Sequence, residues 1–168
     1  KVPKGWTWII NKQNQQYLKA NLLNKAGFKH GFFTRHWNEQ DPNQLATQLS
    51  KSSSIYFPKQ THGSTVKEIS HEDVSKFHET DGLISQKIGQ SLWVCSADCI
   101  PVLIADRASG QVAACHAGWR GVSLQIIPKA LSKLKALGAR QESLLVALGP
   151  AISGRNYQVD LEVASKIA

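Results

Sequence analysis

The sequence contains no methionine, not even at position 1, and no long apolar run. From the missing methionine we expect that the N-terminus is trimmed and that these 168 residues are part of a longer natural product. No segment approaches the roughly 20 apolar residues that a membrane-spanning helix needs. The basic residues at the start precede no apolar segment, which argues against a secretory signal peptide. The sequence therefore predicts a cytoplasmic protein without a membrane partner, and its length predicts a single domain over residues 1–168.

Cysteine is also scarce, since the chain has only Cys95, Cys99 and Cys115 and no CxxC motif. An odd number at this length excludes a disulfide framework and fits a reducing compartment. Cys95 and Cys115 lie in apolar runs. We expect both to fill the core, because free cysteine is among the most buried residue types.

Acidic residues are outnumbered, with 12 against 20 basic ones and a net charge of +8. A basic surface attracts nucleic acid, anionic lipid or phosphorylated small molecules. The charges are scattered, however, and the densest set has the spacing of a solvated helix face: Lys129, Lys133, Lys135 and Arg140. We therefore expect no nucleic-acid partner, and we keep a non-catalytic basic binding module as a competing hypothesis.

Apolar runs of strand length recur along the chain. The longer runs cover residues 92–95, 102–105, 111–116 and 143–148, and shorter ones cover 31–34 and 54–58. Continuous runs of this kind are typical of strands buried on both faces. Leucine and isoleucine then recur in three- and four-residue steps between 124 and 137, which predicts an amphipathic helix. It should end at Gly138 and either begin near Pro128 or kink there. This order predicts a mixed α/β (α+β) fold.

Polar residues gather where three of the expected strands end, in the segments 59–63, 96–101 and 116–121. Each segment holds one candidate, His62, Cys99 or His116, beside a glycine or a proline-bounded turn. If the three side chains converge, two chemistries fit. Two imidazoles and a thiolate form a three-ligand zinc site with an open fourth position. Alternatively, Cys99 is a nucleophile and one histidine is its base. In either case Asp98 could orient a histidine or contact substrate.

Six short motifs follow one another between residues 33 and 160: Phe33–Arg35, Gln60–Gly63, Asp81–Ile84, Ala97–Pro101, His116–Gly121 and Gly149–Ile152. In this order they closely resemble the YfiH family, which is also called the laccase-domain or polyphenol-oxidase-like family. The most specific pair is Ala-Asp-Cys-Ile-Pro with His-Ala-Gly-Trp-Arg-Gly.

The resemblance implies a fold, a metal and an activity. The fold is a mixed β-sandwich flanked by helices, similar to a cysteine-hydrolase toxin fold. The metal is Zn²⁺, with copper as the other possibility, on His62, Cys99 and His116. The activity is phosphorolysis of adenosine, inosine and methylthioadenosine, with adenosine deamination as well, so the partners are purine nucleosides and phosphate.

Further site residues are expected around these ligands. Asp98 is the candidate for handling a proton. The candidates for substrate contact are Arg35, Gln60, Asp81 and Arg120. We expect Arg120 either to hold phosphate or to pack on Trp119.

The sequence departs from the family at three places. His36–Asn38 stands where the family has a glycine-rich turn, and Ser153–Asn156 stands where it has cysteines. Family chains also continue further, so we expect this chain to lack the family's C-terminal portion. Two competing activities stay open: that of a cysteine hydrolase, which uses Cys99 with His62 or His116, and that of a copper-dependent polyphenol oxidase. Six histidines are few for a copper cluster that needs many imidazoles.

Overall fold

The computed structural model describes residues 2–37, 41–51, 53–70 and 79–167. The strands are β1 (Trp6–Ile10), β2 (Gln16–Ala20), β3 (Phe32–Phe33), β4 (Ser54–Tyr56), β5 (Val66–Glu68), β6 (Gly82–Ser85), β7 (Gln90–Leu92), β8 (Ile100–Asp106), β9 (Val112–Ala117) and β10 (Leu144–Leu148). The helices are α1 (Asn21–Lys25), α2 (Pro42–Leu45), α3 (Trp119–Ser123), α4 (Ile126–Ala136) and α5 (Leu161–Ile167), with short 3₁₀ turns at Ala46–Gln48, Gln141–Ser143 and Gly154–Asn156. The mixed α/β class expected from the sequence is confirmed.

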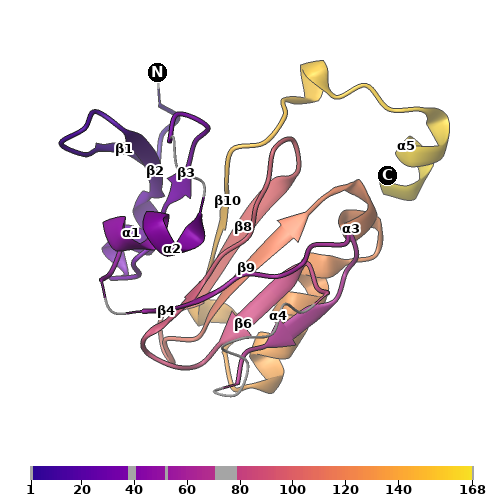
Figure 1. Cartoon of the computed structure of the whole chain (residues 1–168). Helices are drawn as coiled ribbons and strands as arrows, with labels where there is room; N and C mark the ends of the chain where they lie inside the picture. The colour runs from indigo at the N-terminus through magenta and orange to yellow at the C-terminus, as the bar shows by residue number, and fades with distance from the viewer. Residues whose placement is uncertain (1, 38–40, 52, 71–78, 168) are drawn as a thin grey trace.

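A five-stranded sheet in the order β10-β8-β9-β6-β5 forms the centre of the molecule (Figure 1). Its strands are antiparallel except for the parallel pair β5 and β6. The register pairs Pro101 of β8 with His116 of β9, and Gly82 of β6 with Cys115 of β9. The start of β8, the end of β9 and the start of β6 therefore lie at one end of the sheet.

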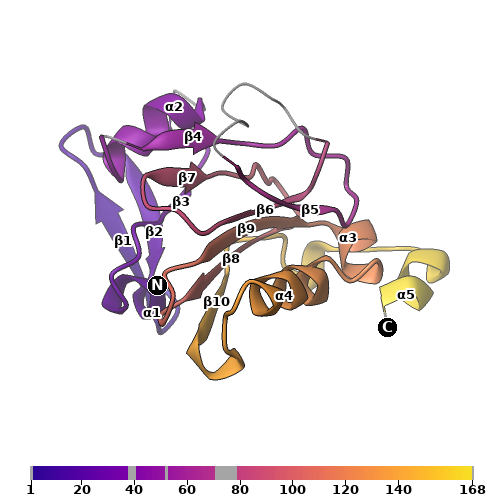
Figure 2. The same cartoon turned by 90° about the horizontal axis from the view of Figure 1, so that it is seen from below.

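Layers cover both faces of this sheet (Figure 2). Helix α4 packs on one face through Ile126, Ala130 and Leu134, which are four residues apart and fully buried. Burying one such leucine or isoleucine side chain stabilises the fold by about 1.5–3 kcal/mol. The two-stranded sheet of β4 and β7 lies against the other face, where Tyr56 packs on Leu83 of β6. The arrangement is a mixed β-sandwich with helices outside.

The N-terminal sheet, in the order β1-β2-β3, packs beside β8 and β10. A tight turn at residues 11–15 joins β1 to β2. The side-chain oxygen of Asn11 accepts hydrogen bonds from the N–H groups of Gln13 and Gln15. Asn14 adopts a left-handed backbone with φ of 60°, a conformation that asparagine tolerates better than most residues. The strands β1 and β2 were not among the strands predicted from the sequence.

Three local expectations are corrected or refined by the structure. The run at 92–95 is a strand only as far as Leu92, and Cys95 is exposed, so the expected core position is wrong for Cys95 and right for the buried Cys115. The expected helix over 124–137 is α4, preceded by the separate short α3, with Gln125 between them at a φ of 61°. Pro128 lies in the first turn of α4, so the helix begins near it and does not kink.

No helix among the described residues is long and apolar enough to span a bilayer.

A buried histidine joins the N-terminal elements. His30 accepts a hydrogen bond at Nε2 from the N–H of Ala20 and donates from Nδ1 to the carbonyl oxygen of Phe28. These two bonds require the neutral ring, because a protonated Nε2 cannot accept. Burial lowers the pKa of His30 from its ordinary 6.5, and the charge of Lys19 acts in the same direction.

The lowered pKa of His30 predicts a loss of stability in mild acid. As the pH falls below 6.5, the unfolded state takes up a proton before the folded state does, so the free energy of unfolding decreases until the folded pKa is reached. The slope is at most about 1.4 kcal/mol per pH unit. Urea unfolding across this range should show a shallower pH dependence for His30→Asn than for the wild type. The matched control is His36→Asn, because His36 is exposed. Equal slopes for the wild type and His30→Asn would contradict the assignment.

Candidate metal centre

Three chain segments meet at the end of the central sheet where β8 begins and β9 ends. Cys99 directly precedes β8, and His116 is the second-last residue of β9. Because Ile100 pairs with Ala117, Cys99 lies across from Gly118. His62 comes from the loop between β4 and β5.

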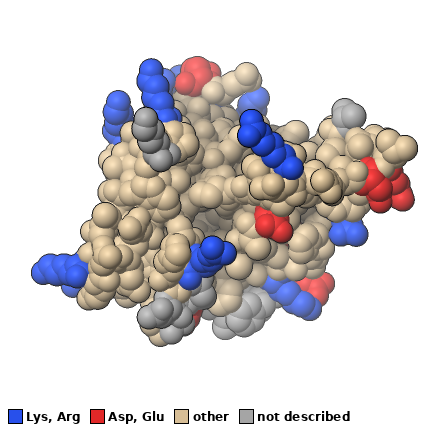
Figure 3. All heavy atoms as spheres, turned by 90° about the horizontal axis from the view of Figure 1, so that it is seen from above, with Lys and Arg blue, Asp and Glu red and all other residues tan. Residues whose placement is uncertain are grey.

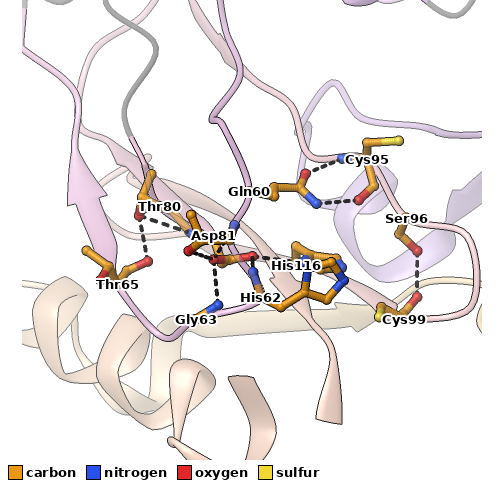
Figure 4. Close-up of polar contacts among 12 residues, drawn as sticks. Gln60, His62, Gly63, Thr65, Thr80, Asp81, Cys95, Ser96, Cys99 and His116 are labelled. Atoms are coloured by element: carbon orange, nitrogen blue, oxygen red, sulfur yellow. Dashed lines mark hydrogen bonds and ion pairs between the residues drawn. The ribbon is translucent and has the colours of Figure 1, made fainter. Parts of the chain in front are cut away.

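The three side chains that sequence analysis singled out lie together (Figure 4). One ligand atom from each of His62, Cys99 and His116 lies within 4.8 Å of the other two. The two imidazole rings meet edge to face, with centroids 4.8 Å apart and an interplanar angle of 87°. His116 is buried, Cys99 is partly buried and His62 is exposed, so the centre opens to solvent on the His62 side.

Asp81 holds the buried histidine in place. Its Oδ1 lies 2.9 Å from Nδ1 of His116, and its backbone oxygen accepts the N–H of His116 at 2.7 Å. The relative exposed areas of the Asp81 and His116 side chains are 0% and 3%. With Nδ1 committed to the carboxylate, Nε2 is left as the ligand atom of His116. A carboxylate behind a histidine in this way is typical of metal sites.

The same carboxylate organises the loop that carries His62. It accepts the backbone N–H groups of Thr61, His62 and Gly63 and the hydroxyl of Thr61, at 2.8–3.1 Å. His62 itself has a φ of 58°, a left-handed backbone that is costly for a residue with a side chain. The hydrogen bonds to Asp81 are the interaction that holds this strained turn.

The pKa of Asp81 reflects these contacts. Burial pushes it upward, but the hydrogen bonds from His116, Gly63 and Thr61 outweigh burial and hold the pKa below its ordinary value of 3.8. Asp81 is therefore a carboxylate at neutral pH. Its side chain has no exposed surface, and its contacts are with His116 and the 61–63 loop, while the expected substrate contact of Asp81 stays a prediction.

Glycines leave the space that the centre needs. A Cβ on Gly118 would lie 2.9 Å from Sγ of Cys99 and 3.4 Å from Cδ2 of His62. A Cβ on Gly121 would lie 2.9 Å from the carbonyl oxygen of Gly63. The start of α3 thus lies so close to Cys99 and to the His62 loop that a side chain at Gly118 or Gly121 would force its neighbours to shift.

Gln60 links the two loops that carry ligands. Its side-chain Nε2 donates to the carbonyl oxygen of Cys95, and its Oε1 accepts the N–H of Cys95, both at 2.7 Å (Figure 4). The side-chain amide of Gln60 therefore pairs with the backbone of Cys95 as a strand residue would. Gln60 lies two residues before His62, and Cys95 lies four residues before Cys99. Gln60 thus makes a contact between loops, and its expected contact with substrate stays a prediction.

The surroundings of Cys99 disfavour a free thiolate. Burial raises the pKa of Cys99 above its ordinary 9.0, and the negative charges of Asp98 and Asp81 raise it further. The side chain of Asp98 is exposed beside Cys99, while its carbonyl oxygen accepts the N–H of Ile152. A bound divalent cation would supply the positive charge that a thiolate requires here.

The two expected arginines are exposed. Arg35 lies in the turn after β3. Arg120 lies in α3 with its guanidinium carbon 4.6 Å from the centre of the Trp119 ring. Of the two positions expected for Arg120, the structure shows the packing on Trp119.

The donor set fits a metal ion. Two imidazoles and a thiolate are ligands that zinc accepts, and three protein ligands with one open side are typical of catalytic rather than structural zinc sites. Asp81 fixes the tautomer of His116, and Gly118 leaves the volume between His62 and Cys99 free. Copper also binds imidazole and thiolate, so the donor set alone does not separate these two metals.

Comparisons with known proteins agree with this fold. A family profile described as multi-copper polyphenol oxidoreductase laccase matches residues 37–168. A protein of Synechocystis named purine nucleoside phosphorylase is 44% identical over 168 residues, which cover 96% of this chain and 62% of that protein. The chain therefore spans less than two thirds of that relative's length.

Solved structures show the same fold. YlmD from Geobacillus stearothermophilus has a TM-score of 0.82 at 23% identity, with 95% of this chain and 71% of that chain covered. The hypothetical protein YfiH of Bacillus licheniformis has a TM-score of 0.77 at 24% identity, with 90% and 68% covered.

Filling the space at Gly118 should weaken metal binding. Its φ of −77° suits any residue, so Gly118→Ala strains only the contacts with Cys99 and His62. We expect the zinc affinity to fall about 10–100-fold, a range found when ligands are displaced from their supported positions. The measurement is competition with a chromophoric chelator. Gly154→Ala is the matched control, because a Cβ there meets nothing within 4 Å. Wild-type affinity in Gly118→Ala would show that the ligands do not need this space.

Removing the charge of Asp81 should weaken metal binding as well as the fold. In Asp81→Asn the bonds to His116 and to the His62 loop lose their charge assistance, so we expect zinc affinity to fall about 10–100-fold. Asp106→Asn is the control. Asp106 is equally buried and accepts hydrogen bonds from Ser109 and Ala108 at the far end of β8. It should lower the free energy of unfolding and leave zinc affinity unchanged. Equal zinc affinity in both variants would contradict the positioning role of Asp81.

Proposed function

We propose that this chain, which belongs to the multi-copper polyphenol oxidoreductase laccase family, also called the YfiH family, carries the metal centre of a purine nucleoside phosphorylase. The observation that carries the proposal is the convergence of His62, Cys99 and His116 at one end of the sheet, with Asp81 behind them. The name of the Synechocystis relative supports the substrate class, purine nucleosides and phosphate.

Zinc is the metal that we assign to the three ligands. Held by His62, Cys99 and His116, it would supply a Lewis acid that polarises a substrate oxygen or orients phosphate. The chain's own residues prepare the centre for it. Asp81 aims Nε2 of His116, the strained turn at His62 presents the second imidazole, and Gly118 keeps the space beside Cys99 open.

Phosphorolysis replaces the N-glycosidic bond of the nucleoside by a bond from ribose C1′ to a phosphate oxygen. The purine leaves with the bonding electron pair and takes up a proton, and ribose 1-phosphate is the second product. Positive charge develops on the ribose as the bond breaks, so a nearby anion stabilises the transition state. The bound phosphate provides that anion and is also the nucleophile.

Exposed residues take the remaining roles. We assign proton transfer to the purine to Asp98, whose carboxylate is exposed next to Cys99. Arg120 and Arg35 are assigned to attract phosphate, with Arg120 having to leave the face of Trp119 to do so. Deamination of adenosine to inosine and ammonia is proposed as a second activity of the same open centre, with water in place of phosphate.

The competing functions explain less of the geometry. A cysteine hydrolase needs Cys99 as a thiolate, and burial together with two carboxylates raises the pKa of Cys99 instead. A multicopper oxidase needs many imidazoles, and the centre holds two. A basic binding module needs a continuous positive surface, whereas lysine and arginine lie apart from one another on the face seen in Figure 3. We place the protein in the reducing cytoplasm, in keeping with three free cysteines.

Removing the thiolate ligand tests the proposal. Adenosine with phosphate should yield adenine and ribose 1-phosphate, and some inosine should form without phosphate. Cys99→Ala should lose both activities together with bound zinc, because a site with two imidazoles binds zinc weakly. Chromatography of the products and elemental analysis of the metal provide the measurements.

Cys95→Ala is the matched control for this experiment. Cys95 is exposed, and Gln60 contacts only its backbone, so the variant should keep zinc and activity. Full phosphorolysis by zinc-free Cys99→Ala would overturn the proposed mechanism. Activity that survives zinc removal but not Cys99→Ala would favour the cysteine hydrolase. Phenol oxidation dependent on copper would favour the oxidase.

A further inference from the structure

A hollow lies between α4 and the start of β5, on the face of the sheet that α4 covers. Its volume is about 360 Å³. The lining residues are Ser64, Thr65, Val66, Lys129, Ser132 and Lys133. None of them is a metal ligand or a residue to which the proposed function assigns a role. We call this hollow the α4 groove.

The two lysines of the α4 groove are held across it. Lys129 and Lys133 are four residues apart and so lie on one side of α4. The ammonium group of Lys129 donates to the hydroxyl of Ser64 at 2.6 Å, and that of Lys133 donates to the carbonyl oxygen of Val66. An ammonium group has three donors, so each lysine keeps two for a ligand. Because these hydrogen bonds already restrict the two lysine side chains, less conformational entropy is lost when a ligand binds.

The charge of these lysines is not balanced within the groove. Among the residues that the structure describes, no acidic side chain lines the groove and neither lysine belongs to an ion pair. The acid that lies closest along β5, Glu68, accepts a hydrogen bond from Gln86 at 2.6 Å. The groove therefore presents two positive charges to solvent.

Hydroxyl groups complete a set of donors. The oxygen of Ser64 accepts from Lys129, which leaves its proton to donate. Thr65 and Ser132 are exposed on the two walls. A ligand that accepts hydrogen bonds in several directions and carries negative charge matches this lining. The two ammonium groups repel a cation, and a wholly apolar ligand would offer no acceptor to the donors that Lys129 and Lys133 keep free.

We propose that the α4 groove binds a phosphate group, separately from the metal centre. A tetrahedral phosphate offers acceptor oxygens to both ammonium groups and to the hydroxyls of both walls at once. The basic residues after 128, whose spacing predicted a solvated helix face, thus fall into two groups. Lys129 and Lys133 line the groove, while Lys135 bonds to Gln141 instead.

The experiment is a titration of the isotope-labelled, zinc-loaded protein with inorganic phosphate, followed by amide NMR at constant ionic strength. We expect saturable shifts at Ser64, Thr65, Ser132 and Lys133. Lys129→Ala combined with Lys133→Ala should weaken this binding at least about tenfold, the factor for losing one charge-assisted hydrogen bond. Lys135→Ala is the matched control, because it removes the same charge from α4 outside the groove, and it should bind phosphate as the wild type does.

The outcomes separate this proposal from the proposed enzyme. No nucleoside is present, so a loss of turnover does not bear on the result. Titration with ribose 5-phosphate in a second arm shows whether free phosphate or a phosphorylated metabolite binds more tightly, and both results require the same two lysines. Shifts confined to the metal centre, shifts reproduced by chloride, or equal affinity in the double variant and in Lys135→Ala would each overturn the proposal.

Discussion

The hydrogen bonds made by the Asp81 carboxylate are the interaction on which the rest of the centre depends. One oxygen holds Nδ1 of His116, and the pair of oxygens together binds the N–H groups of the 61–63 loop. Two candidate ligands, His62 and His116, come from segments far apart in the sequence and are thereby held by one buried carboxylate. Burial of a carboxylate is unfavourable unless its acceptors are used, and here several donors use them. Burial raises the pKa of Asp81, and the hydrogen bonds from His116, Gly63 and Thr61 lower it below its ordinary value.

The third candidate ligand, Cys99, is placed by strand register rather than by Asp81. Cys99 precedes the first paired residue of β8, and pairing of Ile100 with Ala117 brings it opposite Gly118. A slip of one residue in this register would turn Cys99 toward the other face of the sheet. The buried partners along β8 and β9, such as Val102 with Cys115, make such a slip costly because they would leave the core. The packing of α4 on the sheet therefore helps to fix this register and, through it, the position of Cys99.

The sequence predicted the parts of the fold that carry their own signal. The strands β8, β9 and β10 are continuous apolar runs, and α4 has a regular three- and four-residue spacing, so both patterns are visible without tertiary information. The strands β5 and β6 are three and four residues long and owe their structure to pairing with neighbours, which no local pattern reveals. Cys95 was misplaced because a strand was expected to continue beyond Leu92, whereas the backbone of Cys95 pairs with the side chain of Gln60.

The position of Asp81 also decides which chemistry suits the centre. The negative charge of Asp81 orients His116. Burial raises the pKa of Cys99, and the charges of Asp98 and Asp81 raise it further. An enzyme that used Cys99 as a free nucleophile would need a positive group at this place, as thiolates of low pKa have. Neither carboxylate supplies it, and Asp81 cannot be removed without releasing His116 and the 61–63 loop. Held by His62, Cys99 and His116, a divalent cation would resolve the conflict, because it would stabilise the thiolate and bind the imidazole of His116 that Asp81 orients. The electrostatics that raise the pKa of Cys99 are therefore those that a cation held by the three residues would offset.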